Sequence, residues 1–229
     1  MCGVLSCVLA LGAVLTMPGM GMTARAMDTN HYEDGITYTL NNAEHIASVS
    51  SCTSNEIGEE VHIPAIIKHN EIEYKVIAIN IIVFSGCKKI NKITLEEGIQ
   101  YIQEYTFSGT SITEIEIPAS INWMREEIFE GCNSLTRVRF KGTTPPTSID
   151  GDWLRNAANN NIIIEIPEGA EESVWKSTLK LEKYNYNFII QTYDPTVSPN
   201  PSSTTTTSTS SPNQEKNSNG EVEFIEEEP

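Results

Sequence analysis

The sequence has few basic and few aromatic residues, and both shortages limit what the protein can do. It contains 15 Lys and Arg against 31 Asp and Glu in 229 residues, which gives a formal net charge of −16. Nucleic acids and anionic membrane surfaces are bound by clustered basic side chains, so this charge argues against both as partners. Hydrophobic residues make up 39% and aromatic residues 7%, a composition that suits one globular domain with some unfolded sequence.

Long apolar runs are missing except at the N-terminus. Residues 2–23 carry no charge, and Ala24-Arg25-Ala26 is the small-x-small pattern that signal peptidase cleaves. We therefore expect residues 1–26 to be a signal peptide, with no direct membrane insertion after its cleavage. An uncleaved membrane anchor is the alternative, although the apolar run from Cys2 to Met17 is short for a spanning helix.

Cysteine and histidine are scarce, and neither forms a ligand motif. Loss of the signal peptide leaves Cys52, Cys87 and Cys132, an odd number, so the sequence is no disulfide scaffold. It contains no Cys-x-x-Cys and no His-Glu-x-x-His pattern, and we expect neither a metal site nor a cofactor. The histidines are scattered: His31, His45, His62 and His69.

Catalytic motifs are missing as well. Asp150-Gly151-Asp152 lacks the further ligands of a calcium loop, so it is interpreted as an ordinary turn. The acidic residues from Glu168 to Glu172 surround a predicted helix start, where carboxylates favour the helix dipole. No nucleophile elbow and no phosphate-binding glycine loop is recognisable. The sequence predicts a protein that is not an enzyme, with a hydrolase as the remote alternative.

What the sequence does contain is a repeat. "FSGCKKINKITL" begins at Phe84, "FSGTSITEIEI" at Phe107 and "FEGCNSLTRVRF" at Phe129, so the phrase recurs after 23 and then 22 residues. This period lies in the range of leucine-rich repeats, in which each unit supplies one strand and one return segment and buries its apolar residues against its neighbours. Five apolar columns share the period: Val76, Ile99 and Ile121; Ile79, Ile102 and Met124; Phe84, Phe107 and Phe129; Ile93, Ile115 and Val138; Leu95, Ile117 and Phe140.

The repeat resembles a specific family. Apolar-x-x-apolar, four residues, Phe-x-Gly-Cys-x-x-Leu and then apolar-x-apolar-Pro is similar to the BspA-like leucine-rich repeat of bacterial and protist surface proteins, over about residues 34–192. The resemblance implies a mainly β repeat solenoid and adhesion to host proteins or other cells. Two positions depart from the family pattern and predict irregular return segments. Asn80, Gln103 and Arg125 replace its usual glycine, and Val83, Thr106 and Ile128 replace its usual alanine.

The repeat also suggests how the domain is organised. We expect a β-rich N-terminal cap over residues 27–58 and a leucine-rich repeat solenoid over residues 59–142, with a hairpin near His69 and Asn70 leading into the first unit. The resemblance implies a C-terminal cap over residues 143–193, made of a strand, a Pro-Glu-Gly turn and a short helix. Caps are needed because a stacked sheet otherwise ends in open edges.

The last residues have a different composition. Residues 194–229 are rich in Pro, Ser and Thr, and they hold too few apolar residues to offset the entropy cost of ordering. We expect this acidic tail to be disordered, as is typical of a stalk or linker. Its final acidic run is either a solvating segment or a docking tail.

Two of the cysteines occupy the same place in the repeat. Cys87 and Cys132 are two units apart, so stacking at about 4.8 Å per strand separates them by roughly 10 Å. A disulfide requires Cα atoms within about 7 Å of each other. We therefore expect both residues to be small, buried and reduced, and unreactive in the native state.

Two columns of charged residues are predicted on the strands. Alternate residues of a strand share a face, so the neighbours of the core-facing residues should point to solvent. Opposite charges then meet on adjacent strands, where they either neutralise each other across a solvated sheet or bind a partner. The columns are Thr94, Glu116, Arg139 and Glu165, and Lys92, Glu114 and Arg137.

A third column lies on the return segments. Ala78, Tyr101 and Trp123 occupy the same place in successive units, and Arg125 follows close by. Tyr, Trp and Arg dominate binding hot spots, so this column is a candidate contact surface. The alternative is that the two aromatic rings pack beneath a neighbouring loop.

These features predict a secreted or cell-surface protein-interaction module that adheres to host or neighbouring-cell proteins. The expected partner is an extracellular or host-matrix protein. The alternative is a structural or glycan-binding accessory module of the cell envelope. The candidate partner-binding residues are Tyr101, Trp123, Arg125, Glu114, Glu116, Arg137 and Arg139.

Overall fold

Short strands in which apolar and polar residues alternate make up most of this protein. The computed structural model describes residues 29–157, 162–181, 183 and 188–197. The described residues up to Pro195 belong to one unit. The expected signal peptide lies outside the described residues, and so does the expected disordered tail from residue 198 onward.

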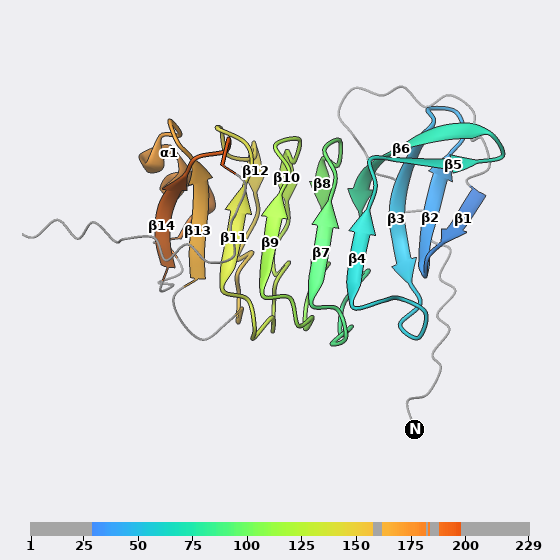
Figure 1. Cartoon of the computed structure of the whole chain (residues 1–229), viewed down its shortest axis with the longest axis horizontal. Coiled ribbons are helices and arrows are strands. Elements are labelled where there is room, and N and C mark those ends of the chain that lie inside the picture. The colour runs from blue at the N-terminus through green and yellow to red at the C-terminus, as the bar shows by residue number, and fades with distance from the viewer. Residues whose placement is uncertain (1–28, 158–161, 182, 184–187, 198–229) are drawn as a thin grey trace, which may run out of the picture. The chain divides into compact units, whose positions relative to one another are not determined.

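One face of the unit, which we call the front face, consists of parallel strands. Its first two strands pair with each other, and the next four form a separate parallel sheet. Figure 1 shows all six side by side. In order along the stack they are β4 (Glu60–Ile63), β7 (Lys92–Leu95), β9 (Glu114–Ile117), β11 (Arg137–Phe140), β13 (Ile162–Pro167) and β14 (Phe188–Tyr193).

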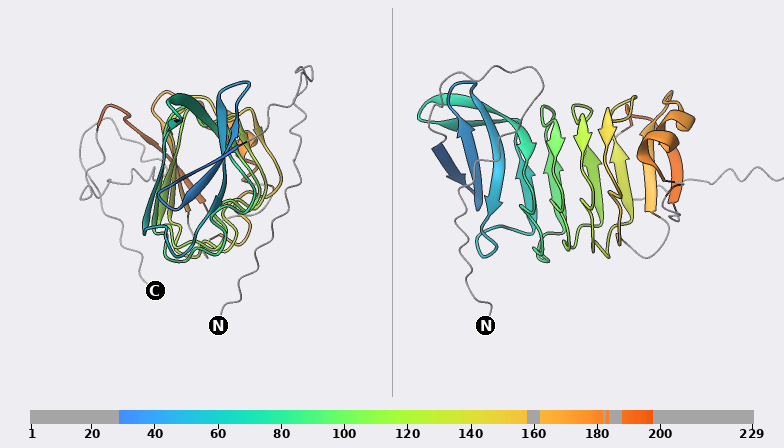
Figure 2. Two further views of the ribbon diagram at one scale, coloured as in Figure 1. Left: turned by 90° about the vertical axis from the view of Figure 1, so that its right-hand side faces the viewer. Right: turned by 180° about the vertical axis from the view of Figure 1, so that it is seen from behind.

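A second face, which we call the return face, is built from the segments that lead back to the front. After β6 (Ile72–Ile79) come the parallel strands β8 (Tyr101–Ile102), β10 (Trp123–Met124) and β12 (Ser148–Ile149). Each of these three strands is 2 residues long, in agreement with the irregular return segments predicted. The end-on view in Figure 2 shows successive turns lying one behind another.

An antiparallel meander closes the first end of the stack. It contains β1 (Thr29–Glu33), β2 (Ile36–Asn41) and β3 (Ile46–Cys52), and β3 pairs with β6 to continue the return face. β5 (Ile66–His69) and β6 form the hairpin expected near His69 and Asn70. Its turn residues Asn70 and Glu71 have φ of 50° and 64°. Positive φ at both positions is the requirement of a type I′ turn, whose twist matches that of the paired strands.

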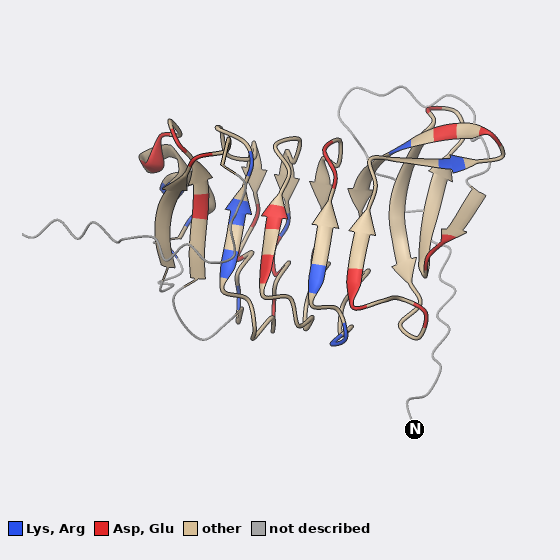
Figure 3. Ribbon diagram, viewed as in Figure 1, with Lys and Arg blue, Asp and Glu red and all other residues tan. Residues whose placement is uncertain are grey.

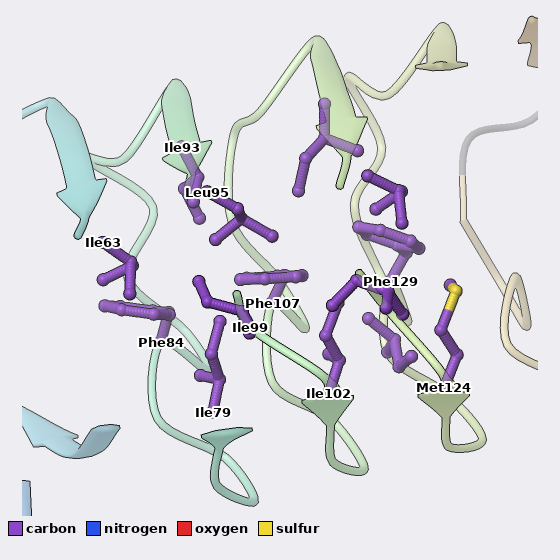
Figure 4. Close-up of a cluster of buried hydrophobic side chains, with 14 of the residues drawn as sticks. Ile63, Ile79, Phe84, Ile93, Leu95, Ile99, Ile102, Phe107, Met124 and Phe129 are labelled. Carbon is purple, nitrogen blue, oxygen red and sulfur yellow. The ribbon is translucent and has the colours of Figure 1, made fainter. Parts of the chain in front are cut away.

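The core lies between the two faces and is organised around a row of aromatic rings. The rings of Phe84 and Phe107 are stacked with centroids 6.0 Å apart, and those of Phe107 and Phe129 are 5.6 Å apart. All three side chains are fully buried. Figure 4 shows them in a row, with Ile63 and Leu95 on one side and Ile102 on another. The predicted apolar columns therefore stack turn upon turn.

The row continues one turn further than the sequence indicated. Trp153 lies next to Phe129, with ring centroids 6.0 Å apart in an edge-on arrangement, and it is fully buried. It stands 24 residues after Phe129 and is a different residue type, which is why the repeat pattern did not reveal it. The strand that follows this turn is β13, which pairs with β11.

The second end is closed by β13, a turn and α1 (Glu172–Leu179), the strand, turn and helix expected there. The helix turns its buried Trp175 against Phe140, with ring centroids 4.9 Å apart. Trp153 Nε1 donates a hydrogen bond of 3.1 Å to the carbonyl oxygen of Leu179. β14, which pairs in parallel with β13, was not predicted.

Glycine is required in the turn after each Phe. Gly86, Gly109 and Gly131 have φ of 73°, 66° and 69°. This left-handed region is strained for most residues that carry a Cβ. A Cβ at Gly109 would also lie 3.6 Å from the backbone of Gly86 in the preceding turn. Because 3.6 Å is an ordinary contact distance, the glycine is required by the backbone conformation of the turn and not by a lack of space.

The prediction that both cysteines are buried is correct for Cys132 and wrong for Cys87. Cys132 is fully buried, and its Sγ lies 3.4 Å from Thr110 Oγ1 of the preceding turn. Cys87 is only half-buried, and its Sγ lies 3.5 Å from Sγ of Cys52. The physical reason is that Cys87 belongs to the first Phe-x-Gly-Cys turn, so its neighbour is the end of β3 rather than another such turn. The three cysteines within residues 29–157 are all free thiols.

We predict that the reduced native protein reacts with iodoacetamide at Cys87 but not at Cys132. The hydrogen bond from Cys52 and the charge of Lys89 lower the pKa of Cys87 to about 7, whereas burial raises the pKa of Cys132. Because the thiolate is the reacting form, the rate at Cys87 should fall about tenfold per pH unit below pH 7. Peptide mass spectrometry after timed labelling measures both rates. Rapid labelling of Cys132 without denaturant would contradict the packing.

Phe107 tests the core. Phe107→Ala removes a ring that is stacked on both sides, so it should lower the free energy of unfolding by about 3–5 kcal/mol in urea titrations. The control is Ile66→Ala, because Ile66 is 49% exposed and its loss should cost about 0.5 kcal/mol or less. A loss below about 1 kcal/mol for Phe107→Ala would mean that the register is wrong.

Candidate functional site

The aromatic column lies on the return face. Tyr101 is paired with Ala78 on one side and with Trp123 on the other, so the three residues are in register as predicted. The rings of Tyr101 and Trp123 are 6.0 Å apart at an interplanar angle of 52°. Trp123 is 41% exposed, Tyr101 is half-buried and Ala78 is buried. The indole is therefore not covered by a neighbouring loop, and the two rings form a surface step rather than part of the core.

Arg125 lies beside this step and is held by two carboxylates. Its Nε is 3.1 Å from Glu104 Oε1, and its Nη1 is 2.5 Å from Asp150 Oδ2. These acids come from the turns before and after it, so the guanidinium links three turns. The hydrogen bond to Asp150 raises the pKa of Arg125 above its ordinary value. One Arg with two acids leaves a net charge of −1, so this group is not a free cation for an anionic partner.

The other predicted residues lie on the front face, apart from the aromatic column. Figure 3 shows the charge alternating between β9, β11 and β13. Arg139 is paired with Glu116 on β9 and with Glu165 on β13, at 3.3 Å and 2.5 Å. Arg137 is 3.5 Å from Glu114. In this part of the sheet the register of the predicted columns is confirmed, and the charges neutralise one another across the strands.

The expectation that Glu165 faces solvent is wrong, because Glu165 is only 4% exposed. The strand that was not predicted, β14, covers it. Gln191 of β14 donates a hydrogen bond of 2.7 Å to Glu165 Oε1. Tyr193 of the same strand places its ring 4.6 Å from the guanidinium carbon of Arg139. Gln191 and Tyr193 are thus members of the site that sequence reasoning missed, although the apolar stretch "NFIIQTY" before the tail was a signal for a strand.

The charged column of Lys92, Glu114 and Arg137 is divided between two sheets. β7 pairs with β4, and Lys92 Nζ lies 3.2 Å from Glu60 Oε2 of that strand. Arg137 and Glu114 form their pair in the separate four-stranded sheet. Within this column Lys92 is therefore neutralised by Glu60 of β4, and Glu114 by Arg137 of β11.

The described residues hold neither a metal-site cluster nor a membrane-crossing helix. No group of three or more His, Cys, Asp or Glu side chains there is arranged to hold a metal ion. No helix in the described segments has the length and apolarity to cross a membrane.

Comparison with protein families gives one match. The family model described as "BspA type Leucine rich repeat region (6 copies)" matches residues 55–181. A comparison with curated proteins found no match.

Several solved structures are similar to this chain. A leucine-rich repeat protein from Bacteroides ovatus is 26% identical with a TM-score of 0.49, and the match covers 61% of this chain and 36% of that one. The pneumococcal vaccine antigen PcpA is 16% identical with a TM-score of 0.47, covering 63% of this chain and 45% of that one. A leucine-rich repeat protein from Bacteroides capillosus is 20% identical with a TM-score of 0.37, covering 49% and 99%. The matched part therefore spans less than half of the first two chains.

Glu165 offers a test of the front face. Glu165→Ala leaves the largely buried guanidinium of Arg139 without its nearest carboxylate, so it should cost about 3 kcal/mol or more of unfolding free energy. Glu114→Ala is the control, because the Glu114 side chain is 66% exposed and such a surface pair contributes about 1 kcal/mol or less. Equal costs in chemical denaturation would show that Glu165 is solvated.

Proposed function

Because the chain belongs to the BspA-type leucine-rich repeat family, we propose that it is a secreted or cell-surface protein-interaction module that adheres to proteins of a host or of neighbouring cells. The family supports an interaction role because repeat stacks offer extended surfaces that need no catalytic group. The signal-peptide pattern of residues 1–26 supports delivery outside the cell.

The observation that carries the proposal is the exposed step of Tyr101 and Trp123. An indole that is 41% exposed on a short strand gains little for stability from its position. Exposed aromatic residues next to Arg are the residue types in which binding energy is concentrated. Arg125 holds a fixed geometry through Glu104 and Asp150, so little side-chain entropy is lost when a partner contacts it.

The charged front face is the weaker candidate. Glu116 and Arg139 already satisfy one another, and Glu165 is covered by β14. A partner that docked there would have to replace existing ion pairs, at a desolvation cost that new pairs only partly offset. We therefore assign the main contact to the return face and only a secondary part to Glu114, Glu116, Arg137 and Arg139.

The charge of the chain indicates what the partner should look like. The net charge of −16 and the two acids around Arg125 favour a protein surface that presents apolar groups surrounded by Lys and Arg. Complementary charge of this kind mainly accelerates association and weakens with salt. We propose an extracellular or host-matrix protein with such a basic surface.

Glycan binding within an envelope module is the second candidate. It is favoured by one observation, namely that hydrogen-bonding side chains border the aromatic step: Gln103 and Ser148 are both partly exposed near Tyr101 and Trp123. Rings flanked by a few polar groups are the usual composition of a small-ligand site. In this case soluble oligosaccharides would compete with the partner protein.

The proposal is tested with Trp123→Ala and an immobilised mixture of host extracellular-matrix proteins. We expect Trp123→Ala to weaken binding by about 2 kcal/mol or more, roughly 30-fold, because it removes the exposed indole. Glu116→Ala should have a much smaller effect, because its charge pairs within the sheet. Surface plasmon resonance measures both, with thermal unfolding recorded for each variant.

The matched control is Tyr32→Ala, which removes an aromatic ring that is 51% exposed but lies on β1, away from the column. It should bind as the unaltered protein does. If folded Glu116→Ala loses more affinity than folded Trp123→Ala, the contact surface is the front face. If the protein shows no saturable binding to any matrix protein but binds to a glycan array, adhesion to proteins is contradicted. The envelope function then replaces it.

A further inference from the structure

Two thiols meet where the N-terminal cap joins the first repeat. Cys52 is the last residue of β3, and Cys87 belongs to the turn that follows Phe84. Their Sγ atoms are 3.5 Å apart, although the residues are 35 positions apart in the chain. Cys52 Sγ also lies 3.0 Å from the carbonyl oxygen of Val83. The side chain of Cys52 is therefore directed at the turn that carries Cys87.

Hydrogen bonds fix the backbone on both sides of the pair. Thr53 N donates to the carbonyl oxygen of Gly35 at 2.8 Å, next to Cys52. Cys87 N donates to the carbonyl oxygen of Phe84 at 3.1 Å. The two thiols are thus held by structured segments, and their closeness does not depend on a mobile loop.

The two thiols differ in acidity and share access to solvent. Both residues are half-buried. The hydrogen bond with Cys52 and the nearby Lys89 lower the pKa of Cys87, while the same hydrogen bond and burial raise the pKa of Cys52. One thiolate that is available near neutral pH, next to one protonated thiol, is the arrangement in which a first thiol attacks and a second resolves.

We propose that Cys52 and Cys87 are a disulfide-forming site that covalently joins the N-terminal cap to the first repeat. The bond needs the Sγ separation to shorten from 3.5 Å to about 2.0 Å, which a small rotation of the side chains can provide. The odd cysteine is then Cys132, which stays a free thiol because it is fully buried against Thr110 and Phe107.

The reaction requires a disulfide oxidant, such as glutathione disulfide or a disulfide-bearing oxidoreductase. The Cys87 thiolate attacks one sulfur of the oxidant, forming a mixed disulfide and releasing one thiolate. Cys52 then loses its proton to solvent and attacks the Cys87 sulfur, releasing the second thiolate. In total the two cysteines lose two electrons and two protons, and one oxidant disulfide is reduced to two thiols.

The position of the bond gives it a structural role. β3 reaches the solenoid mainly through its pairing with β6, and a single cap must keep the first edge of the stack closed. A cross-link over 35 positions restricts the unfolded chain strongly and should raise the melting temperature by roughly 10 °C. The cap then stays attached under conditions in which an open edge would recruit other chains.

The site is tested on the full chain incubated with glutathione disulfide or with dithiothreitol. Peptide mass spectrometry without reduction should show Cys52 linked to Cys87, with Cys132 alkylated only after denaturation. The oxidised protein should melt roughly 10 °C above the reduced one. Cys52→Ser and Cys87→Ser should each abolish this difference, whereas Cys132→Ala should retain it.

Three results would overturn the proposal. The first is a mixed disulfide of Cys87 with glutathione that does not react further with Cys52. The second is a disulfide that joins Cys132 to Cys52 or to Cys87. The third is a protein in which Cys52, Cys87 and Cys132 all remain free thiols after oxidation. Because these readouts are made on the unaltered chain, they hold even if a cysteine variant folds poorly.

Discussion

Each turn of this protein stacks its central aromatic ring against the rings of the adjacent turns. Phe84, Phe107, Phe129 and Trp153 form one continuous row through the core. Repeat units bury their apolar residues against their neighbours, so a turn that slipped would move its ring out of this row. The parallel pairing of both faces keeps successive turns in the register that this row requires. The caps are needed for the same reason, since the rings at the two ends would otherwise have one bare side.

The same register produces two unlike surfaces. On the front face, strands of four or more residues place opposite charges side by side, and the pairs around Arg139 satisfy one another. On the return face, strands of two residues leave only one outward position each, so a single aromatic column dominates. The front face therefore contributes to stability and solubility. The return face keeps Trp123 exposed, which is the physical basis for placing the interaction there.

The sequence revealed features that have a periodic or a local signal and missed those that depend on contacts between distant segments. The five apolar columns, the hairpin at Asn70 and the C-terminal helix could be predicted because each has a periodic or local signal. Trp153 could not, since it differs from Phe in type and spacing. Glu165 was assigned to solvent because its cover, β14, pairs through the backbone, and backbone pairing partners leave no signature in residue order. The contact of Cys52 with Cys87 escaped because a cap strand has no repeat position from which its neighbours can be counted.

The glycine turns have a consequence for how such a molecule can change in length. Gly86, Gly109 and Gly131 have nearly the same backbone conformation, so these three turns present the same backbone to their neighbours. A duplicated unit can therefore pack between two existing turns in the same way as its parent unit does. The stack then grows by about 4.8 Å without any change to its ends. The length of the stack is therefore set by the number of repeat units. Gene duplication can set the spacing between the two ends while the residues that close them remain as they are.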